Sequence, residues 1–320
     1  MGQLVNGVWQ TEALLAKNKN GKFNRQDSVF RQWLSADPDA EFPAESGRYH
    51  LYVSYACPWA HRTLIFRSLK GLEDMISVSV VHWHMGDDGW QFSPDEGLVD
   101  DLGGHALLHQ VYSAAKSDYT GRVTVPVLWD KKTSRIVSNE SSDIIRMLNT
   151  AFDRVGAKAG DYYPEHLRSE IDAVNERVYH DVNNGVYKSG FATSQEAYEE
   201  AVTTLFDALD WLEHRLSKQA YLIGDTLTEA DWRLFPTLLR FDAVYHGHFK
   251  CNRKMIHEYP NLWNYTKALY QHPGVKQTVH FDHIKKHYYQ SHPSVNPSGV
   301  VPVGPGLDFD GAHDRDRFLR

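Results

Sequence analysis

Apolar and polar residues alternate along residues 49–55, which is typical of a β-strand with one buried face. Over residues 57–69 the apolar positions instead recur at three- and four-residue spacing, as on one face of an α-helix. Residues 76–83 alternate again and then become continuously apolar, as a central strand does. These three segments predict a βαβ unit in the first half of the chain.

The βαβ pattern is followed by further elements of the same half. The segment 84–122 is too long for an ordinary connection, and it contains a helical pattern over 106–115. Two short β-rich runs and a helix then follow, at 123–129, 135–138 and 142–148. The order βαβ-α-ββ-α, with a cysteine at the start of the first helix, predicts a thioredoxin-like α/β domain.

Glycine and charged residues over 156–161 indicate a linker, and the pattern beyond it is almost purely helical. Helices are predicted at 164–182, 194–216, 229–245 and 261–271, with shorter ones after them. Thr228 and Asp231 have the spacing of a capping box, and a helix start is all that they indicate. The predicted organisation is an N-terminal extension (1–48), the thioredoxin-like domain (49–150), an all-helical domain (164–290) and an extended tail (291–320) that wraps the surface or mediates assembly.

The composition fits a folded globular chain and disfavours several classes of function. The 320 residues are 42% hydrophobic and 12% aromatic, and the net charge is −7. Because there is no dense run of Lys or Arg, nucleic acid and anionic membranes are poor candidate partners. No apolar run reaches membrane-spanning length, the first residues lack the pattern of a signal peptide, and only two cysteines are present. These features together predict a reducing, cytoplasmic location.

One of the two cysteines, Cys57, lies where the first strand gives way to the first helix. A thiol at a helix N-terminus faces backbone N–H groups and the positive end of the helix dipole, and both favour the thiolate. Pro58 suits the first helical position. Ala60 stands where a dithiol oxidoreductase has its second cysteine, so a mixed disulfide on Cys57 needs an external thiol, and glutathione is the abundant cytosolic one. Position alone leaves open whether Cys57 is a reactive thiol or a small buried hydrophobe.

Two further motifs fit a tripeptide site around Cys57. Val125-Pro126 precedes a predicted strand, and a cis proline at this place in a thioredoxin-like fold exposes the preceding backbone to an extended peptide. Without the context of the fold, a trans proline would be expected. At Glu140-Ser141 a helix start can receive a carboxylate while Glu140 holds an ammonium group, as the amino-acid end of a γ-glutamyl group requires. In isolation the same stretch is equally typical of an ordinary helix cap.

Across nearly its whole length the chain resembles the glutathionyl-hydroquinone reductases, the Xi class of the glutathione transferase superfamily. The matching stretches are 49–71 with its Cys-Pro-Trp-Ala-His-Arg motif, 121–128, 136–147, 182–194, 227–249 and 281–288. The resemblance implies a thioredoxin-like N-terminal domain and an all-α glutathione-transferase C-terminal domain. The stretch 84–104 is shorter than in family members, so the resemblance says least about the outer rim of the substrate pocket.

The resemblance also implies a role for individual residues. Cys57 would be the nucleophile and Tyr187 the acid/base group near the aromatic ring, while Tyr245 and Tyr288 would donate hydrogen bonds that favour the thiolate. Glutathione would be bound by Trp90, Arg122, Val123, Thr124, Val125, Glu140 and Ser141. The implied activity is reduction of glutathionyl-hydroquinones through a Cys57–glutathione mixed disulfide, with glutathione as co-substrate, release of oxidised glutathione, no metal and a homodimeric enzyme.

The residues alone do not exclude several other activities. The same cysteine could serve an omega-like thiol transferase that reduces dehydroascorbate or protein mixed disulfides. A conjugating glutathione transferase would instead need a Ser or Tyr that activates glutathione without joining it covalently. His280, His283 and His287 have the helical spacing of a metal-ligand face, and His82 and His84 form another pair, but a chain with 18 histidines has chance clusters. A purely ligand-binding role would require an unreactive Cys57.

Overall fold

The structure is a computed structural model that describes residues 2–11, 19–23 and 25–318. The chain divides into two compact units. Unit 1 comprises the described residues of 1–15, 26–160 and 278–287, and unit 2 those of 16–25, 161–277 and 288–320. Parts of the expected N-terminal extension and of the expected tail therefore lie outside the described residues.

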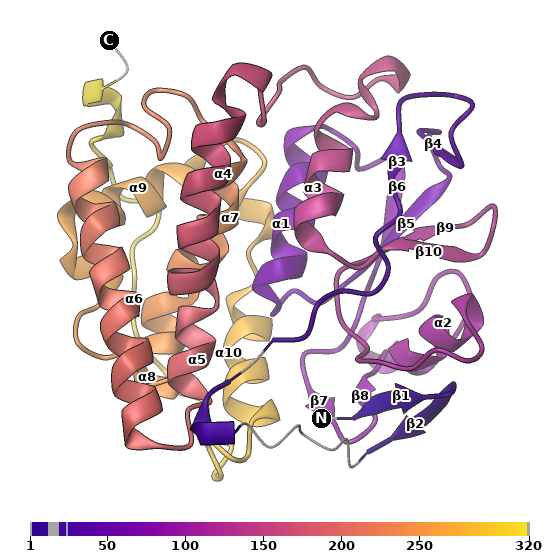
Figure 1. The fold of residues 1–320 in the computed structure, drawn as a ribbon, viewed down its shortest axis with the longest axis horizontal. Helices are drawn as coiled ribbons and strands as arrows, with labels where there is room; N and C mark the ends of the chain where they lie inside the picture. Colours follow the sequence, from indigo (N-terminus) through magenta and orange to yellow (C-terminus); the bar gives the residue numbers. More distant parts are fainter. Residues whose placement is uncertain (1, 12–18, 24, 319–320) are drawn as a thin grey trace. The chain divides into compact units, whose positions relative to one another are not determined.

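Unit 1 is built on a four-stranded sheet of order β10-β9-β5-β6 (Figure 1). Its strands are β5 (Tyr49–Val53), β6 (Ile76–Val80), β9 (Val127–Asp130) and β10 (Arg135–Ser138). β5 and β6 are parallel, whereas β9 is antiparallel to both β5 and β10. Every residue of β5 is buried, as in a central strand covered on both faces. This topology confirms the thioredoxin-like arrangement.

The helices of unit 1 follow the predicted order. α1 (Pro58–Leu69) packs on α3 (Ser141–Thr150), while α2 (Leu108–Ala115) contacts β10 and the short strand β8 (Gly89–Trp90), which pairs with β7 (Met85–Gly86). The strand predicted over 123–129 is wrong in its first part, because pairing begins at Val127, after the proline that cannot donate to a ladder. The residues before it form an irregular segment.

The N-terminal part of unit 1 forms two small sheets of its own and runs beside β10. β1 (Gln3–Val5) and β2 (Val8–Gln10) pair as a hairpin, and β3 (Leu34–Ser35) pairs with β4 (Phe42–Pro43). Between these pairs the chain runs along β10, where Gln32 N donates to Val137 O at 2.9 Å and Asn139 N donates to Phe30 O at 3.1 Å. The extension therefore reaches the end of β10, where α3 begins.

Unit 2 is helical, with no strand among its described residues (Figure 1). Its helices are α4 (Arg168–Arg177), α5 (Gly185–Gly190), α6 (Gln195–Leu216), α7 (Glu229–Arg240), α8 (His246–His248), α9 (Pro260–Gln271) and the end of α10 (Phe281–Ser291). Two predicted continuous helices, 164–182 and 229–245, are wrong: they pass into the π-helical segments Val178–Asn183 and Phe241–Tyr245. The sequence analysis also did not identify α5.

The capping box at the start of α7 is confirmed, and it does more than begin a helix. Thr228 N donates to Asp231 Oδ2 at 2.8 Å, while Leu222 N and Tyr265 Oη donate to Asp231 Oδ1 at 2.8 and 2.7 Å. Burial raises the pKa of Asp231 to about 6 against these hydrogen bonds. The carboxyl group thus ties α7 to the preceding loop and to α9.

The C-terminal segment packs on the helices of unit 2. Arg315 Nη1 donates to Leu216 O at 2.7 Å, and Gln271 Nε2 donates to Phe309 O at 2.7 Å. Lys267 Nζ also donates to Ala312 O. Over the described residues 292–318 the chain forms turns and one 3₁₀ turn. This agrees with an extended segment that lies along a surface.

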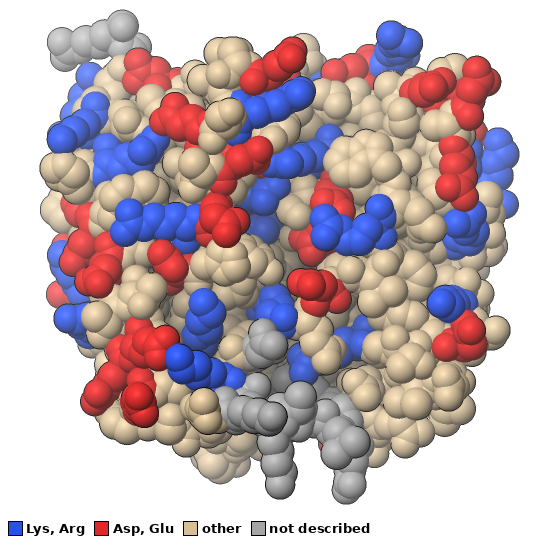
Figure 2. All heavy atoms as spheres, in the orientation of Figure 1, with Lys and Arg blue, Asp and Glu red and all other residues tan. Residues whose placement is uncertain are grey.

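Charges of both signs are interspersed over the face seen in Figure 2. None of the described helices is both long enough and apolar enough to span a bilayer.

The carboxylate of Asp100 stabilises unit 1 to an extent that depends on pH. Its carboxylate accepts hydrogen bonds from Tyr52 Oη at 2.9 Å, Leu102 N at 3.1 Å and His105 Nδ1 at 2.6 Å. Burial by itself would raise the pKa, but the hydrogen bonds lower it to about 2 from a usual 3.8. Because the pKa in the folded state is the lower one, this stabilisation is complete above about pH 4 and is lost as the pH falls through 2.

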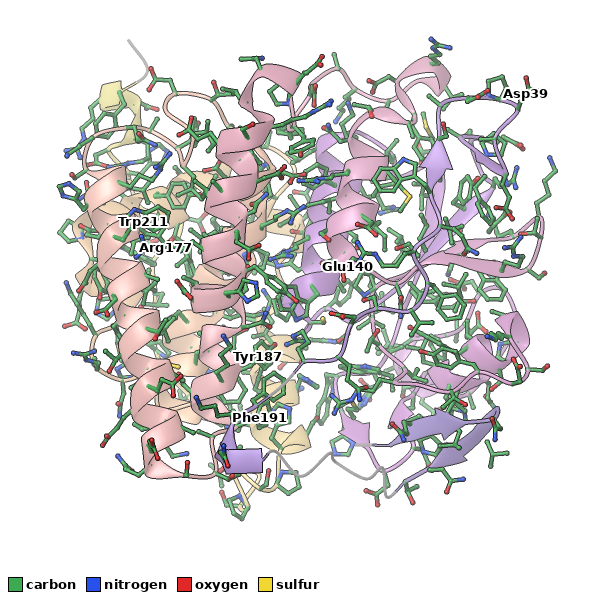
Figure 3. All side chains as sticks on the ribbon, in the orientation of Figure 1. Asp39, Glu140, Arg177, Tyr187, Phe191 and Trp211 are labelled. Atoms are coloured by element: carbon green, nitrogen blue, oxygen red, sulfur yellow. The ribbon has the colours of Figure 1, made fainter. Side chains whose placement is uncertain are left out.

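We therefore expect Asp100→Asn to reduce the free energy of unfolding by about 2 kcal/mol at neutral pH. The difference from the parent protein should shrink as the pH falls from 4 to 2. Denaturant unfolding across a pH series measures it, with Asp39→Asn as the control, because Asp39 lies exposed in a loop (Figure 3). An equal loss at every pH would contradict the assignment.

Candidate active site

Cys57 caps the N-terminus of α1 in unit 1. Its backbone is extended, Pro58 occupies the first helical position, and Cys57 O accepts the hydrogen bond from His61 N at 3.0 Å. The side chain is partly exposed, and its Sγ lies 3.6 Å from Val125 O. Cys57 is thus an accessible thiol at a helix start. Cys57 is therefore not a small buried hydrophobe, the alternative that its position left open. Cys251, by contrast, is fully buried, and desolvation raises the pKa of its thiol.

Two tyrosines, one in α2 and one after its C-terminal end, hold the segment beside Cys57 in place. The Val125-Pro126 peptide bond is cis, as predicted from the fold context. Tyr119 Oη donates to Arg122 O at 3.0 Å, and Tyr112 Oη donates to Thr124 O at 2.8 Å while accepting from Thr124 N at 3.3 Å. These tyrosines bind backbone groups of the segment, and Arg122, Val123 and Thr124 are partly exposed. The structure therefore brings this predicted segment next to the thiol.

Glu140 caps α3 with its side chain (Figure 3). Oε1 accepts from Ser142 N at 3.0 Å and from Ser142 Oγ at 2.8 Å, and Oε2 accepts from Ser28 Oγ at 2.9 Å. Burial would raise the pKa of Glu140, but these hydrogen bonds and the charge of Arg62 bring it below its usual value. A carboxylate can accept about four hydrogen bonds, so these leave capacity for one more donor. The cap interpretation is confirmed, and it is compatible with binding an ammonium group.

Arg62 is a site residue that the sequence analysis missed. It lies on α1, is 2% exposed, and its Nη1 donates to Ser141 Oγ at 3.4 Å. Its guanidinium also stacks at 4.5 Å from the centre of the Trp59 ring. A positive charge therefore lies beside the start of α3, where the sequence predicted a carboxylate site. The available signal was the position of this arginine, three residues from both Trp59 and Ile65 and therefore on the apolar face of the helix.

Trp90 and the histidines of α10 form aromatic pairs within unit 1. His287 stacks on Trp90 with ring centres 4.9 Å apart, and its Nδ1 lies 2.8 Å from Trp83 O. His280 stacks on Tyr55 at 3.6 Å, and His283 meets the same ring edge-on at 5.4 Å. The helical spacing of these histidines thus serves aromatic packing. Among the residues that the structure describes, no three or more His, Cys, Asp or Glu side chains gather as metal ligands would.

The three tyrosines predicted to be catalytic lie together in unit 2. Tyr288 Oη is 2.5 Å from Tyr187 Oη and 3.0 Å from Tyr245 Oη. Tyr187 comes from α5, Tyr245 ends the second π-helical segment, and Tyr288 comes from α10. Tyr245 and Tyr288 are at most 1% exposed, whereas Tyr187 is partly exposed. The family resemblance thus selected three phenols that lie in one cluster, and the link of this cluster to the thiol stays a prediction.

The surroundings of Tyr187 include residues that the sequence analysis did not select. Phe23 and Phe191 each stack on the Tyr187 ring with centres 6.2 Å apart, and Figure 3 shows Tyr187 and Phe191 on α5 and its C-terminal end. The guanidinium carbon of Arg25 lies 5.0 Å from the centre of the same ring, and Arg25 Nε donates to Asn184 Oδ1 at 2.7 Å. The N-terminal residues 19–25 carry no periodic pattern that would have indicated this role.

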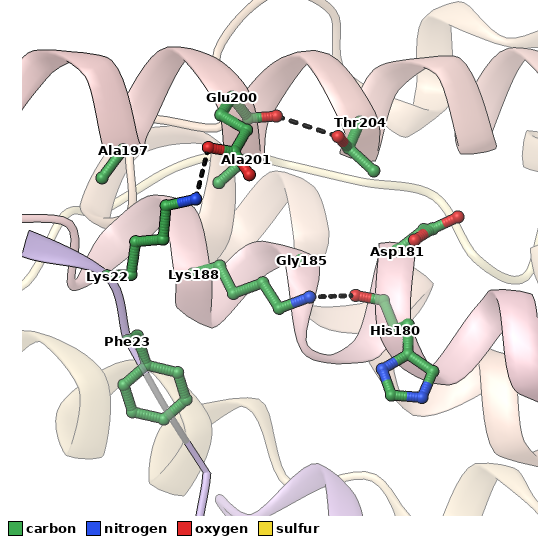
Figure 4. A pocket seen from close by; sticks show the side chains of 10 residues that line it. All are labelled: Lys22, Phe23, His180, Asp181, Gly185, Lys188, Ala197, Glu200, Ala201 and Thr204. Carbon is green, nitrogen blue, oxygen red and sulfur yellow. Dashed lines mark hydrogen bonds and ion pairs between the residues drawn. The ribbon is translucent and has the colours of Figure 1, made fainter. Parts of the chain in front are cut away.

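Phe23 also lines a surface pocket of about 180 Å³ in unit 2 (Figure 4). Two lysines line this pocket, and both already contact acceptors of the chain. Lys22 Nζ lies 2.6 Å from Glu200 Oε2, and Lys188 Nζ donates to His180 O at 3.0 Å. We therefore assign no ligand to this pocket.

Comparison with known proteins agrees with this description. The model of the glutathione S-transferase N-terminal domain matches residues 56–151, and that of the C-terminal domain matches residues 195–268. The chain is 58% identical to the glutathionyl-hydroquinone reductase PcpF of Sphingobium chlorophenolicum, over 97% of this chain and 98% of that protein.

Solved structures give the same result. The glutathione-bound YqjG of Escherichia coli K-12, a glutathione transferase homologue, superposes with a TM-score of 0.91 at 53% identity, over 98% of this chain and 99% of that one. The Xi class glutathione transferase of Natrialba magadii gives a TM-score of 0.94 at 51% identity, over 99% and 97%. A thioredoxin-like unit together with an all-helical unit defines the glutathione transferase fold. Within that superfamily, the chain belongs to the Xi class, the glutathionyl-hydroquinone reductases.

Proposed function

We propose that this protein reduces glutathionyl-hydroquinones to hydroquinones with glutathione as co-substrate. The observation that carries the proposal is the accessible Cys57 thiol at the start of α1, next to the Val125 backbone and in the same unit as the Glu140 cap. The family relationship supports the same activity, because PcpF is named for it.

The proposed glutathione site uses residues of unit 1. The ammonium group of the γ-glutamyl end donates to Glu140, whose low pKa keeps it ionised at neutral pH. The adjacent carboxylate is received by Ser141 and the start of α3, with the positive charge of Arg62 beside it. The peptide backbone of glutathione pairs with Val125, Arg122–Thr124 supply further contacts, and Trp90 packs over the ligand. These assignments direct the glutathione sulfur toward Cys57.

The proposed reaction has two displacement steps at sulfur. In the first, the Cys57 thiolate attacks the glutathione sulfur of the substrate, an S–S bond forms, and the bond from sulfur to the aromatic carbon breaks. The electron pair of that bond stays on the ring, which takes a proton from Tyr187 directly or during tautomerisation. Hydroquinone leaves, and Cys57 carries a glutathionyl group.

In the second step, the thiolate of another glutathione attacks the mixed disulfide, releasing oxidised glutathione and the Cys57 thiolate. The chain itself offers poor alternatives for this step. Ala60 stands at the usual place of a resolving cysteine, and Cys251 is buried with a raised pKa. Monothiol chemistry with two glutathiones is therefore the pathway that the residues favour.

A comparison of three substrates tests the proposed function. We expect turnover to be highest with a glutathionyl-hydroquinone and much lower with dehydroascorbate and with a small mixed disulfide. A preference for dehydroascorbate or the disulfide would favour the omega-like thiol transferase instead. Absence of a glutathione adduct on the protein after exposure to oxidised glutathione would favour a conjugating transferase.

Replacing Glu140 by glutamine tests the glutathione site. The variant loses a charge-assisted hydrogen bond to the ammonium group, so we expect KM for glutathione to rise about tenfold or more. Glu196→Gln is the matched control, since Glu196 also lies in the first turn of a helix, α6, but is exposed. Steady-state kinetics with varied glutathione measures the change. An unchanged KM would remove Glu140 from the binding site.

Further expectations from the sequence also stand as proposals. We propose that the enzyme is a homodimer, that it works in the cytoplasm, and that the boundaries at 49–150 and 164–290 delimit its functional domains.

A further inference from the structure

The N-terminal extension is fastened to the start of α3 at two points, one on each side of Glu140. Phe30 N donates to Asn139 Oδ1 at 3.1 Å, and Asn139 N donates to Phe30 O at 3.1 Å. Arg31 forms two bonds to Asp143 in the first turn of α3, from Nε to Oδ2 at 2.5 Å and from Nη2 to Oδ1 at 2.8 Å. The extension is therefore held against the helix start that carries Glu140.

Ser28 lies where this extension meets the Glu140 side chain. Its Oγ is 2.9 Å from Glu140 Oε2 and 3.3 Å from Asn139 O. A hydroxyl has one proton to donate, and a carboxylate is a stronger acceptor than a neutral carbonyl. Ser28 therefore donates to Glu140, across 112 positions of the sequence.

The donors around the Glu140 carboxylate show what this bond does. Oε1 accepts from both Ser142 N and Ser142 Oγ, whereas Oε2 accepts from Ser28 Oγ. Each carboxylate oxygen can accept about two hydrogen bonds, so Oε1 is filled by this count and Oε2 has one position left. The Ser28 hydroxyl occupies the other position on Oε2, and it thereby fixes the direction from which a further donor can approach.

The charge on Glu140 is preserved by this arrangement. Burial raises the pKa of Glu140, but the hydrogen bonds from Ser142 and Ser28 and the charge of Arg62 bring it below its usual value. Ser28 and Ser142 are neutral donors, so they stabilise the carboxylate without neutralising it. The negative charge thus remains available to a cationic ligand group.

The extension also supports the segment beside Cys57, through Asn139. Asn139 Nδ2 donates to Tyr112 Oη at 3.2 Å, and Tyr112 Oη donates to Thr124 O at 2.8 Å. Thr124 directly precedes Val125, whose carbonyl oxygen lies next to the Cys57 thiol. The same few residues of the extension therefore contact both halves of the proposed glutathione site.

We propose that the N-terminal extension completes the glutathione site, and that Ser28 is a positioning residue that directs Glu140 toward the ammonium group of the ligand. This inference rests on the glutathione site of the proposed function and deepens it. The pair Ser28–Glu140 then recognises the free α-amino group of the γ-glutamyl end, so the site selects ligands that carry one.

Two ligands that differ in one amino group test this role. One is S-methylglutathione, which has no thiol for exchange, and the other is its counterpart without the α-amino group. We expect Ser28→Ala to raise Kd for S-methylglutathione about three- to tenfold, the effect of one misplaced hydrogen bond. Kd for the counterpart should stay nearly unchanged, and Ser28→Thr, which keeps the hydroxyl, should restore most of the affinity. Isothermal titration calorimetry measures each Kd.

Ser35→Ala is the matched control, because Ser35 is another partly exposed serine of the extension. Its Oγ accepts from Asp37 N at 3.1 Å, away from Glu140, so its loss should alter neither Kd. In a Glu140→Gln background, Ser28→Ala should add little, since both changes act on the same carboxylate. Thermal unfolding shows that each variant is folded.

Three results would overturn the proposal: an unchanged Kd for S-methylglutathione in folded Ser28→Ala, equal weakening of both ligands, or a full effect of Ser28→Ala in the Glu140→Gln background. Equal weakening would mean that the extension only keeps the unit rigid. A parent protein that shows the expected Ser28 effects but does not reduce glutathionyl-hydroquinones would instead refute the proposed reaction, and it would support the role of Ser28.

Discussion

Replacement of Cys57 by serine is expected to abolish glutathionyl-hydroquinone reduction, with a loss of at least about 10³-fold in turnover. A hydroxyl at the start of α1 cannot form the S–S bond that both displacement steps require. The same change should abolish the mass increase of one glutathionyl group that the protein gains from oxidised glutathione. Intact-mass spectrometry and a turnover assay measure the two effects on one sample.

Cys251→Ser is the control for this experiment. Cys251 is fully buried in unit 2 and has a raised pKa, so its loss should leave both the adduct and the turnover unchanged. An adduct that persists in Cys57→Ser and disappears in Cys251→Ser would place the reactive thiol elsewhere. Full turnover in Cys57→Ser would rule out the covalent route altogether.

Replacement of Tyr187 by phenylalanine is expected to slow hydroquinone release about 10²- to 10⁴-fold, the range over which a positioned general acid contributes. The ring and its stacking with Phe23 and Phe191 are retained, so the variant removes the proton and little else. Glutathionylation of Cys57 by oxidised glutathione should proceed at nearly the parent rate. Rapid mixing of enzyme with substrate, followed by quantification of hydroquinone, measures the first rate.

Tyr198→Phe serves as the comparison for Tyr187→Phe. Tyr198 is a half-exposed tyrosine of α6 whose Oη donates to Lys250 O at 2.7 Å, so its loss should alter neither rate. If Tyr187→Phe slows both half-reactions to the same extent, Tyr187 does not act as the proton donor. It would then contribute to the formation of the mixed disulfide.

Local patterns predicted most elements of unit 1. Alternation over 49–55 and helical spacing over 57–69 depend only on neighbours a few residues away. Both patterns could therefore be recognised in the sequence without a structure. The same is true of Pro58 at the first helical position and of the Thr228–Asp231 cap, which are set by the backbone groups of a single helix end. These features required no knowledge of the rest of the chain.

The helices of unit 2 were predicted less well, for a specific reason. The patterns over 164–182 and 229–245 are continuous, but the chain inserts π-helical segments at Val178–Asn183 and Phe241–Tyr245. A π segment adds one residue per turn, and apolar spacing in a short window does not resolve that change. The difference matters because Tyr245 ends one of these segments, and its place among the phenols depends on it.

The sequence by itself determined the fold class, and it predicted a reactive Cys57. Through the family resemblance it also predicted the residues of the glutathione site and the three tyrosines, and these site assignments remain proposals. The tertiary structure decided which groups those residues meet. Ser28 donates to Glu140 from 112 positions away, Arg62 donates to Ser141 from 79 positions away, and Tyr187 meets Tyr288 across 101 positions. Such pairs arise only when the packing of whole elements is fixed, because hydrophobic periodicity gives the face that a residue occupies and not its partner on another element.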